Sequence, residues 1–201
     1  MDSNQESKMT SSSNLLLHCC CGPCATASID RFVQLGYKVV PYFFNPNIEP
    51  EDERKRRLGA FLAVCQSKML TPIVEDDPDY SHKRGLDRCF SCYSVRLEKT
   101  KLVARRLGLN YFSTSLLISP YQKHELIKQV GSGLEGFVYE DLRPFYKDSQ
   151  QQAKELGVYR QKYCACLESL EESKWLAKRK SEMKRQKSGP TKEWVPRWLA
   201  K

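Results

Sequence analysis

Short apolar runs alternate with longer amphipathic segments along most of this chain. The runs that predict strands are Leu15–His18, Lys38–Phe44, Leu70–Val74 and Tyr111–Leu117. The segments that predict helices are Ala25–Leu35, Glu51–Ser67, Cys92–Leu107, Tyr121–Val130 and Ser149–Leu156. Strands that alternate with helices at this spacing favour an α/β fold with a parallel sheet of Rossmann type.

The two ends of the chain differ in composition from the region between them. Residues 1–13 are polar and rich in serine, so we expect a disordered leader there. From Lys174 onward, ten basic and two acidic residues give a charge of +8, which is nearly all of the net charge of +9. The predicted organisation is therefore a leader (1–13), one domain (14–172) and a basic tail (173–201).

The basic character of the chain favours an anionic partner such as nucleic acid. Three tryptophans lie within the basic tail, at Trp175, Trp194 and Trp198. This tail suits either phosphate contact with base stacking or a solvated, partly helical appendage. No apolar run is long enough for a membrane span or a signal peptide. We therefore expect a soluble cytoplasmic protein that has no membrane partner.

Four of the nine cysteines crowd the end of the first predicted strand. They are Cys19, Cys20, Cys21 and Cys24, within the stretch Leu-Leu-Leu-His-Cys-Cys-Cys-Gly-Pro-Cys at 15–24. In an open α/β sheet, ligands bind at the carboxyl ends of the strands. The partial positive charge at a helix N-terminus also favours thiolates, which are the form that binds metals.

Two further clusters extend this cysteine pattern. Cys89 and Cys92 form a Cys-x-x-Cys pair at a helix start, and Cys164 and Cys166 form a Cys-x-Cys pair. Two distant groups of cysteines indicate a metal site, and their spacing leaves zinc and an iron–sulfur cluster both open. A disulfide across one residue is strained and easily reduced, which would suit redox chemistry, although the spacing alone favours two plain thiols or extra metal ligands. Cys65 stands alone in a helical segment and is interpreted as a core residue.

Several linked motifs follow one another between Leu15 and about Glu172. They are His18 to Pro23, Asn45-Pro46-Asn47-Ile48, Arg88 to Leu97, Leu116 to Glu125, Tyr139 to Pro144, and Tyr159 to Cys166. In this order they resemble the motifs of the QueH family of iron–sulfur epoxyqueuosine reductases.

The resemblance implies a Rossmann-like domain similar to that of adenine-nucleotide α-hydrolases. It implies reduction of epoxyqueuosine to queuosine at the wobble position of a tRNA with a GUN-type anticodon. By the same resemblance, Cys20, Cys21, Cys89 and Cys92 hold a [4Fe–4S] cluster, and Cys164 and Cys166 are a redox-active pair. An electron donor protein or other reductant is then required.

Other residues are candidates for supporting roles. The run of three cysteines leaves the ligand register open by one residue, so that Cys19 can replace a neighbour. Cys24 is expected to line the site and to bind one additional iron, or else to be a buried structural thiol. Ala165 stands where the family usually has glycine, which raises the conformational cost of a bridge. His18 and Tyr163 are candidate proton donors, while His18 also fits a structural residue at a strand end. Asp141 and Arg143 either contact the substrate or form a salt bridge within their loop. His124 is expected on a helix surface without an assigned role.

Two other functions are compatible with parts of the pattern. A zinc-bearing tRNA-binding module without catalysis would use the cysteine clusters but would not need the Cys-x-Cys pair. An ATP-dependent tRNA thiolase would share the fold. The first strand, however, ends in cysteines and not in a phosphate-binding loop rich in serine and glycine.

Overall fold

The computed structural model describes residues 13–76 and 88–187, with side chains to residue 185. The chain divides into two compact units, 1–161 and 162–201. The strands are β1 (Asn14–His18), β2 (Lys38–Phe43), β3 (Ile73–Val74) and β4 (Tyr111–Thr114). The α-helices are α1 (Gly22–Gln34), α2 (Glu51–Ser67), α3 (Arg88–Arg106), α4 (His124–Ser132), α5 (Tyr146–Glu155) and α6 (Leu167–Lys187). Two 3₁₀ helices complete the set, η1 (Ser115–Ile118) and η2 (Arg143–Phe145).

A four-stranded parallel sheet forms the centre of the first unit, with the strand order β3-β2-β1-β4. Leu16 of β1 pairs with Val40 of β2 on one side and with Phe112 of β4 on the other. The chain therefore moves outward from β1 to β3 and then crosses back to place β4 on the opposite side of β1. This arrangement confirms the predicted Rossmann-like α/β class.

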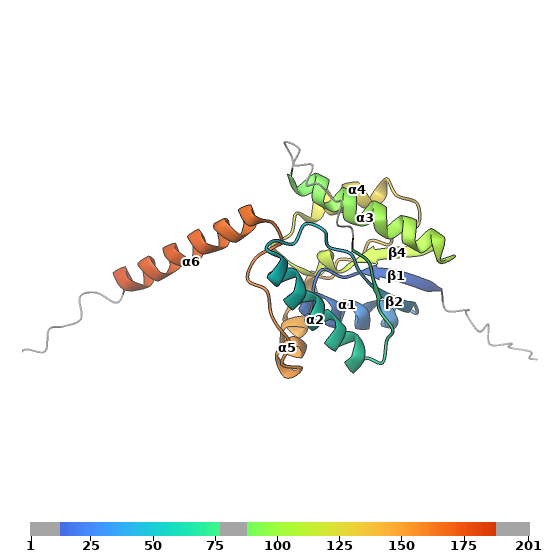
Figure 1. Ribbon diagram of the computed structural model, residues 1–201, viewed down its shortest axis with the longest axis horizontal. Coiled ribbons are helices and arrows are strands. Elements are labelled where there is room, and N and C mark those ends of the chain that lie inside the picture. Colours follow the sequence, from blue (N-terminus) through green and yellow to red (C-terminus); the bar gives the residue numbers. More distant parts are fainter. Residues whose placement is uncertain (1–12, 77–87, 188–201) are drawn as a thin grey trace, which may run out of the picture. The chain divides into compact units, whose positions relative to one another are not determined.

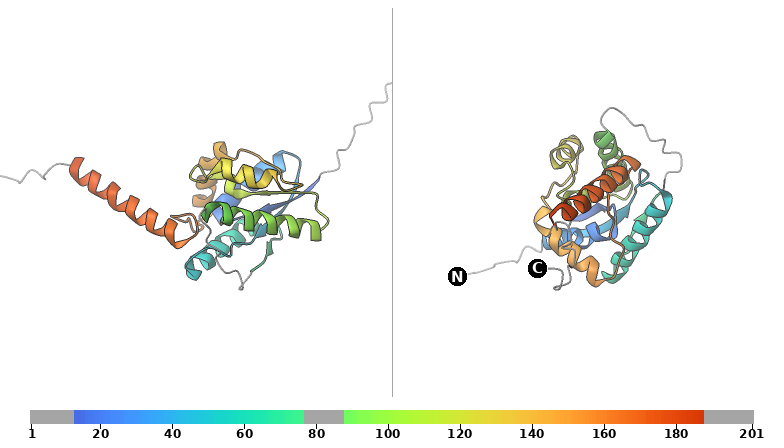
Figure 2. Two further views of the ribbon diagram at one scale, coloured as in Figure 1. Left: turned by 90° about the horizontal axis from the view of Figure 1, so that it is seen from above. Right: turned by 90° about the vertical axis from the view of Figure 1, so that its left-hand side faces the viewer.

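Helices cover both faces of the sheet (Figures 1 and 2). On one face α1 contacts α2 and α5, and on the other α3 contacts α4, β1 and β4. The central strand β1 is consequently apolar on both faces, and Leu15, Leu16 and Leu17 are all fully buried. A continuous apolar strand of this kind is typical of a parallel sheet that is covered on both sides.

Several element boundaries differ from the sequence prediction. Among the helices, α3 begins at Arg88, α4 at His124 and α5 at Tyr146. The first helix begins at Gly22, three residues earlier than expected, because the Cys21 sulfur accepts the Cys24 backbone N–H and caps it. The last strand ends at Thr114, and the apolar residues after it form η1. There the Thr114 hydroxyl oxygen accepts the Leu116 N–H. The third strand contains only Ile73 and Val74.

The second unit contains one long helix, α6. It begins at Leu167 and continues to Lys187, so it runs through the predicted boundary between 172 and 173. Four acidic residues lie in the helix, three of them in its first six positions, and basic residues dominate its second half. This order suits the helix dipole. The predicted leader, except Ser13, lies outside the described residues.

Among the described residues, no helix is both long enough and apolar enough to cross a membrane.

Candidate functional site at the carboxyl end of β1

The site lies where the strand order reverses. β1 is followed by cysteines and β4 by Ser115, and these two strands are neighbours whose carboxyl ends point the same way. The Cys20 backbone N–H donates to the Ser115 hydroxyl oxygen at 3.3 Å, which ties the two loops together. Open α/β sheets bind their ligands at this reversal point.

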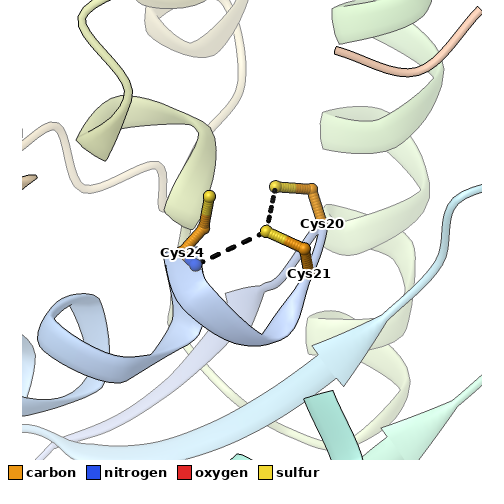
Figure 3. Close-up of side chains that lie close together, drawn as sticks. All are labelled: Cys20, Cys21 and Cys24. Atoms are coloured by element: carbon orange, nitrogen blue, oxygen red, sulfur yellow. Dashed lines mark hydrogen bonds between the residues drawn. The ribbon is translucent and has the colours of Figure 1, made fainter. Parts of the chain in front are cut away.

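Three cysteine sulfurs gather there. Those of Cys20, Cys21 and Cys24 all lie within 4.8 Å of one another, and all three residues are buried (Figure 3). The sulfurs of Cys20 and Cys21 are 3.7 Å apart, and the Cys24 N–H donates to the Cys21 sulfur at 3.4 Å. Pro23 fits the first turn of α1 because that turn needs no N–H from it. Together these features bring the Cys24 sulfur close to the sulfurs of Cys20 and Cys21.

The three cysteines differ in the pKa of their thiols. Hydrogen bonds from the Cys21 and Cys24 thiols, helped by the positive charge of Arg96, hold the pKa of Cys20 well below its ordinary value. Burial, followed by the hydrogen bond to Cys20, raises the pKa of Cys21, and hydrogen bonds to Cys20 and Cys21 raise that of Cys24. Full deprotonation of this trio therefore requires a cation, and thiolate sulfur favours zinc, copper(I) or iron–sulfur groups.

Cys19 lies apart from this group. Its thiol donates to the Leu17 carbonyl at 3.4 Å, and burial, with Cys65 as the next cause, raises its pKa well above the ordinary value. Cys65 is itself buried in α2, and its burial raises its pKa to about 12. Of the three consecutive cysteines, the structure brings Cys20 and Cys21 to Cys24.

Cys89 and Cys92 lie half-buried in the first two turns of α3. The Asn47 amide N–H donates to the Cys92 sulfur at 2.5 Å, and the Asn47 amide oxygen accepts from Arg96 at 2.5 and 3.0 Å. Because the charge of Arg96 also acts on Cys20, these contacts connect Cys92 to the site through Arg96. Neither Cys89 nor Cys92 belongs to the group of sulfurs that all lie within 4.8 Å of one another, the spacing that would suit ligands of a single ion.

Two buried arginines supply positive charge to the sulfurs. Arg57 and Arg96 are only 1% and 2% exposed. Burial raises the pKa of Cys21, and the charge of Arg57, which forms a 2.8 Å ion pair with Glu53, opposes that rise. The charge of Arg96 helps the hydrogen bonds from Cys21 and Cys24 to lower the pKa of Cys20. Buried cations need nearby anions. The site therefore suits an anionic group held by thiolates, as an iron–sulfur cluster is, and its donor set fits such a group.

His18 has a structural position. Its Nε2 donates to the Phe44 carbonyl at 3.0 Å and its Nδ1 accepts from the Thr114 hydroxyl at 2.9 Å. It is fully buried, and desolvation lowers its pKa to about 4. The neutral ring thus links the ends of β1, β2 and β4, and each of its nitrogens already has a hydrogen-bond partner.

The candidates Asp141 and Arg143, which follow α4, and His124 at the start of α4 form local contacts. Arg143 donates to both carboxylate oxygens of Asp141, and this interaction lowers the pKa of Asp141 to about 2. Both side chains are exposed. The expectation that His124 lies on a helix surface is wrong: it is buried at the start of α4, and its Nε2 lies 3.0 Å from the Ser119 carbonyl.

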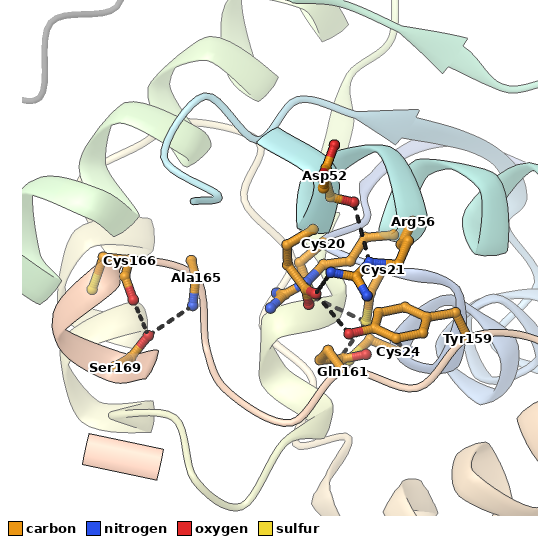
Figure 4. A network of polar contacts seen from close by, with 12 residues as sticks. Cys20, Cys21, Cys24, Asp52, Arg56, Tyr159, Gln161, Ala165, Cys166 and Ser169 are labelled. Atoms are coloured by element: carbon orange, nitrogen blue, oxygen red, sulfur yellow. Dashed lines mark hydrogen bonds and ion pairs between the residues drawn. The ribbon is translucent and has the colours of Figure 1, made fainter. Parts of the chain in front are cut away.

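Cys164 and Cys166 belong to the second unit. Cys164 is exposed and Cys166 half-buried, and no disulfide occurs in the described part of the chain. Between them, the Ala165 N–H donates to the Ser169 hydroxyl oxygen at 3.1 Å, and that hydroxyl donates to the Cys166 carbonyl at 2.8 Å (Figure 4). These bonds fix the backbone of the pair at the start of α6.

Sequence reasoning missed several residues that shape the site. They are Ser115, Arg57 and Glu53; Arg96, Asn47 and Gln161 appeared only as parts of longer motifs. Gln161 donates from Nε2 to the Cys21 sulfur at 2.9 Å, across 140 positions of sequence. Its place three residues before Cys164 was the signal available in the sequence.

The comparison with protein families shows to which family the chain belongs. The profile of a family described as epoxyqueuosine reductase QueH matches residues 15–172. The chain belongs to the QueH family. This membership confirms the resemblance drawn from the motifs.

Curated QueH proteins match over most of their length. The epoxyqueuosine reductase QueH of Dehalococcoides mccartyi is 37% identical over 171 residues, covering 77% of this chain and 91% of that protein. The one from Thermotoga maritima is 32% identical over 178 residues, covering 78% and 90%. That of Streptococcus pyogenes is 31% identical over 177 residues, covering 77% and 69%.

One solved structure supports the fold assignment of this QueH chain. The U34-tRNA thiolase NcsA from Methanococcus maripaludis, solved with its [4Fe–4S] cluster, superposes with a TM-score of 0.53. Its sequence is 13% identical, and the match covers 85% of this chain and 66% of that one. The likeness concerns the fold, which agrees with the predicted similarity to adenine-nucleotide α-hydrolases.

Proposed function

We propose that this protein reduces epoxyqueuosine to queuosine at the wobble position of tRNA anticodons, the last step of queuosine biosynthesis. Membership of the QueH family is the observation that carries the proposal. The buried cysteine group at the reversal of strand order supports it, because the group provides a metal site where the fold places its ligands.

The cofactor proposed is a [4Fe–4S] cluster held by Cys20, Cys21, Cys89 and Cys92. Directly adjacent cysteines can bind different irons of one cluster, and the thiolates of such a cluster lie farther apart than ligands of a single ion. Cys89 and Cys92 stand outside the compact group of Cys20, Cys21 and Cys24, which is consistent with ligands that surround a larger group. Cys24 is then available as a ligand of one additional iron. When bound, these groups would supply single electrons and a Lewis acid.

Residues of the chain provide the environment for that chemistry. Arg57 and Arg96 offset the negative charge of a thiolate-bound group, and burial keeps water from the sulfurs. The Cys164 and Cys166 dithiol supplies two electrons and two protons when it closes to a disulfide. These balance the conversion of one epoxide to one alkene and one water, and an external reductant then restores the dithiol.

The substrate is a tRNA with a GUN-type anticodon, and the electron donor is a reducing protein or small reductant. The basic residues of α6 and beyond suit contact with tRNA phosphates. Since tRNA modification and thiol reduction share the cytoplasm, we place the activity there.

Metal analysis of anaerobically purified protein tests the cofactor. Serine substitution of Cys20, Cys21, Cys89 or Cys92 should lower the iron and sulfide content, whereas Cys65→Ser should leave both unchanged because Cys65 is a core residue of α2. A full complement of zinc in active protein would contradict the iron–sulfur assignment. It would favour the alternative, a zinc-bearing tRNA-binding module, which the 3.7 Å spacing of the Cys20 and Cys21 sulfurs also permits.

Single alanine variants of the Cys-x-Cys pair test the enzyme assignment. Cys164→Ala and Cys166→Ala should each keep the cluster and the affinity for tRNA but lose turnover under chemical reductant. Normal turnover by both variants would remove the dithiol from the mechanism. Loss of iron in both would make these residues cluster ligands instead.

A further inference from the structure

Gln161 reaches the sulfur group from a distant part of the first unit. Its Nε2 lies 2.9 Å from the Cys21 sulfur and 3.6 Å from the Cys24 sulfur, so a single amide donates toward both (Figure 4). The Cys21 sulfur also accepts the Cys24 backbone N–H at 3.4 Å. Two N–H groups therefore converge on one buried sulfur.

The segment that carries Gln161 is anchored to α2. The Tyr159 hydroxyl donates to the second carboxylate oxygen of Glu53 at 2.6 Å, while the first oxygen of Glu53 pairs with Arg57 at 2.8 Å. The guanidinium of Arg56 lies 5.3 Å from the centre of the Tyr159 ring. These contacts hold the backbone two residues before Gln161 and thereby direct its side chain to the sulfurs.

The orientation of the Gln161 side-chain amide bears on the protonation state of the two sulfurs. Its oxygen, Oε1, is sealed from solvent and accepts no hydrogen bond within the described residues. Two thiols could donate S–H bonds to that oxygen if the amide were rotated. The N–H donors point at the sulfurs instead, and N–H donors stabilise a deprotonated cysteine more than a neutral one. The amide is thus placed for thiolates bound to a metal.

We propose that Gln161 is a positioning residue of the metal centre, which orients the Cys21 and Cys24 sulfurs and raises the reduction potential of the iron–sulfur group at Cys21. This inference rests on the cofactor proposed above. Reduction adds negative charge to the cluster and its sulfurs. A hydrogen-bond donor stabilises the reduced form more than the oxidised form, and hydrogen bonds to sulfur are a known determinant of cluster potential.

A redox titration monitored by electron paramagnetic resonance tests the proposal. Gln161→Leu removes the N–H at nearly constant size, and Gln161→Glu replaces the amide with a carboxylate of the same shape. Gln151→Leu is the matched control, because Gln151 is exposed on α5 and donates to Glu155. The midpoint potential should fall in Gln161→Leu, fall further in Gln161→Glu and stay at the wild-type value in the control.

Each outcome separates this proposal from that of the cofactor. An unchanged potential in Gln161→Leu, at wild-type iron and sulfide content, would overturn the role of Gln161 and leave the cofactor intact. Wild-type protein without iron and sulfide would instead overturn the cofactor.

A second measurement applies if Gln161→Leu binds no cluster. Cobalt(II) titration of the apoprotein should then show at least about tenfold weaker affinity than wild type, the usual loss when a residue that orients a ligand is removed. Equal cobalt affinity would overturn the proposal.

Discussion

Gly22 allows α1 to approach α2 directly beside the cysteine group. A Cβ atom at this position would lie 2.6 Å from the backbone carbon and oxygen of Ala60, which is 0.8 Å short of the 3.4 Å at which ordinary contact begins. Backbone atoms cannot rotate away as a side chain could, so Gly22→Ala must move the two helices apart. Overpacking of this kind costs about 1–3 kcal/mol of unfolding free energy.

The assay is thermal unfolding followed by circular dichroism, with iron content measured on the same samples. For a domain of this size, the expected cost lowers Tm by roughly 2–12 °C. Iron content should also fall, because Cys21 and Cys24 flank the displaced residue.

The same substitution at Gly59 provides a control of opposite sign. Gly59 lies on the exposed side of α2 and has no heavy atom within 4 Å of an added Cβ. Alanine there should stabilise the helix by about 0.5–1 kcal/mol. A Gly22→Ala variant with wild-type Tm and iron content would refute the argument that this contact positions the site.

Three further changes test other parts of the molecule. Tyr159→Phe should lower the unfolding free energy in denaturant titration by about 1.5–3 kcal/mol, since it removes a hydrogen bond to a buried carboxylate. Tyr111→Phe is the control and should cost less, because the described part of the chain shows no hydrogen bond of the Tyr111 hydroxyl. Cys24→Ala should lower the iron content by the additional iron alone; unchanged iron and turnover would make Cys24 structural. Deleting residues 174–201 should flatten the log–log salt dependence of tRNA binding by roughly 0.7–0.9 for each phosphate that the tail neutralises, and an unchanged slope would assign binding to the first unit.

Local signals made most of the fold predictable. Helix α2 has the predicted bounds, Glu51–Ser67, because acidic residues fill its first turn and a continuous helical segment follows. Residues 115–117 were wrongly predicted as strand. A short apolar run has no distinctive period, and the hydroxyl of Thr114 decides the conformation by capping a 3₁₀ turn.

The candidate site was predictable only where its residues are close in sequence. The position of the cysteines after β1 follows from a strand that ends at a Gly-Pro turn. The contacts of Gln161 with Cys21 and of Tyr159 with Glu53 join residues 140 and 106 positions apart. Such pairs depend on how α2 and the segment after α5 pack, which no local pattern records. The ligand roles of Cys20, Cys21, Cys89 and Cys92 stay predictions.

The central claim is tested most directly by incubating anaerobically purified protein with tRNA that contains epoxyqueuosine and a low-potential reductant. The nucleosides are then released and identified by mass spectrometry. We expect epoxyqueuosine to disappear and queuosine, which is lighter by one oxygen atom, to appear in equal amount, with no conversion when the reductant is omitted. Intact epoxyqueuosine after incubation with iron- and sulfide-loaded protein and reductant would contradict the proposed function.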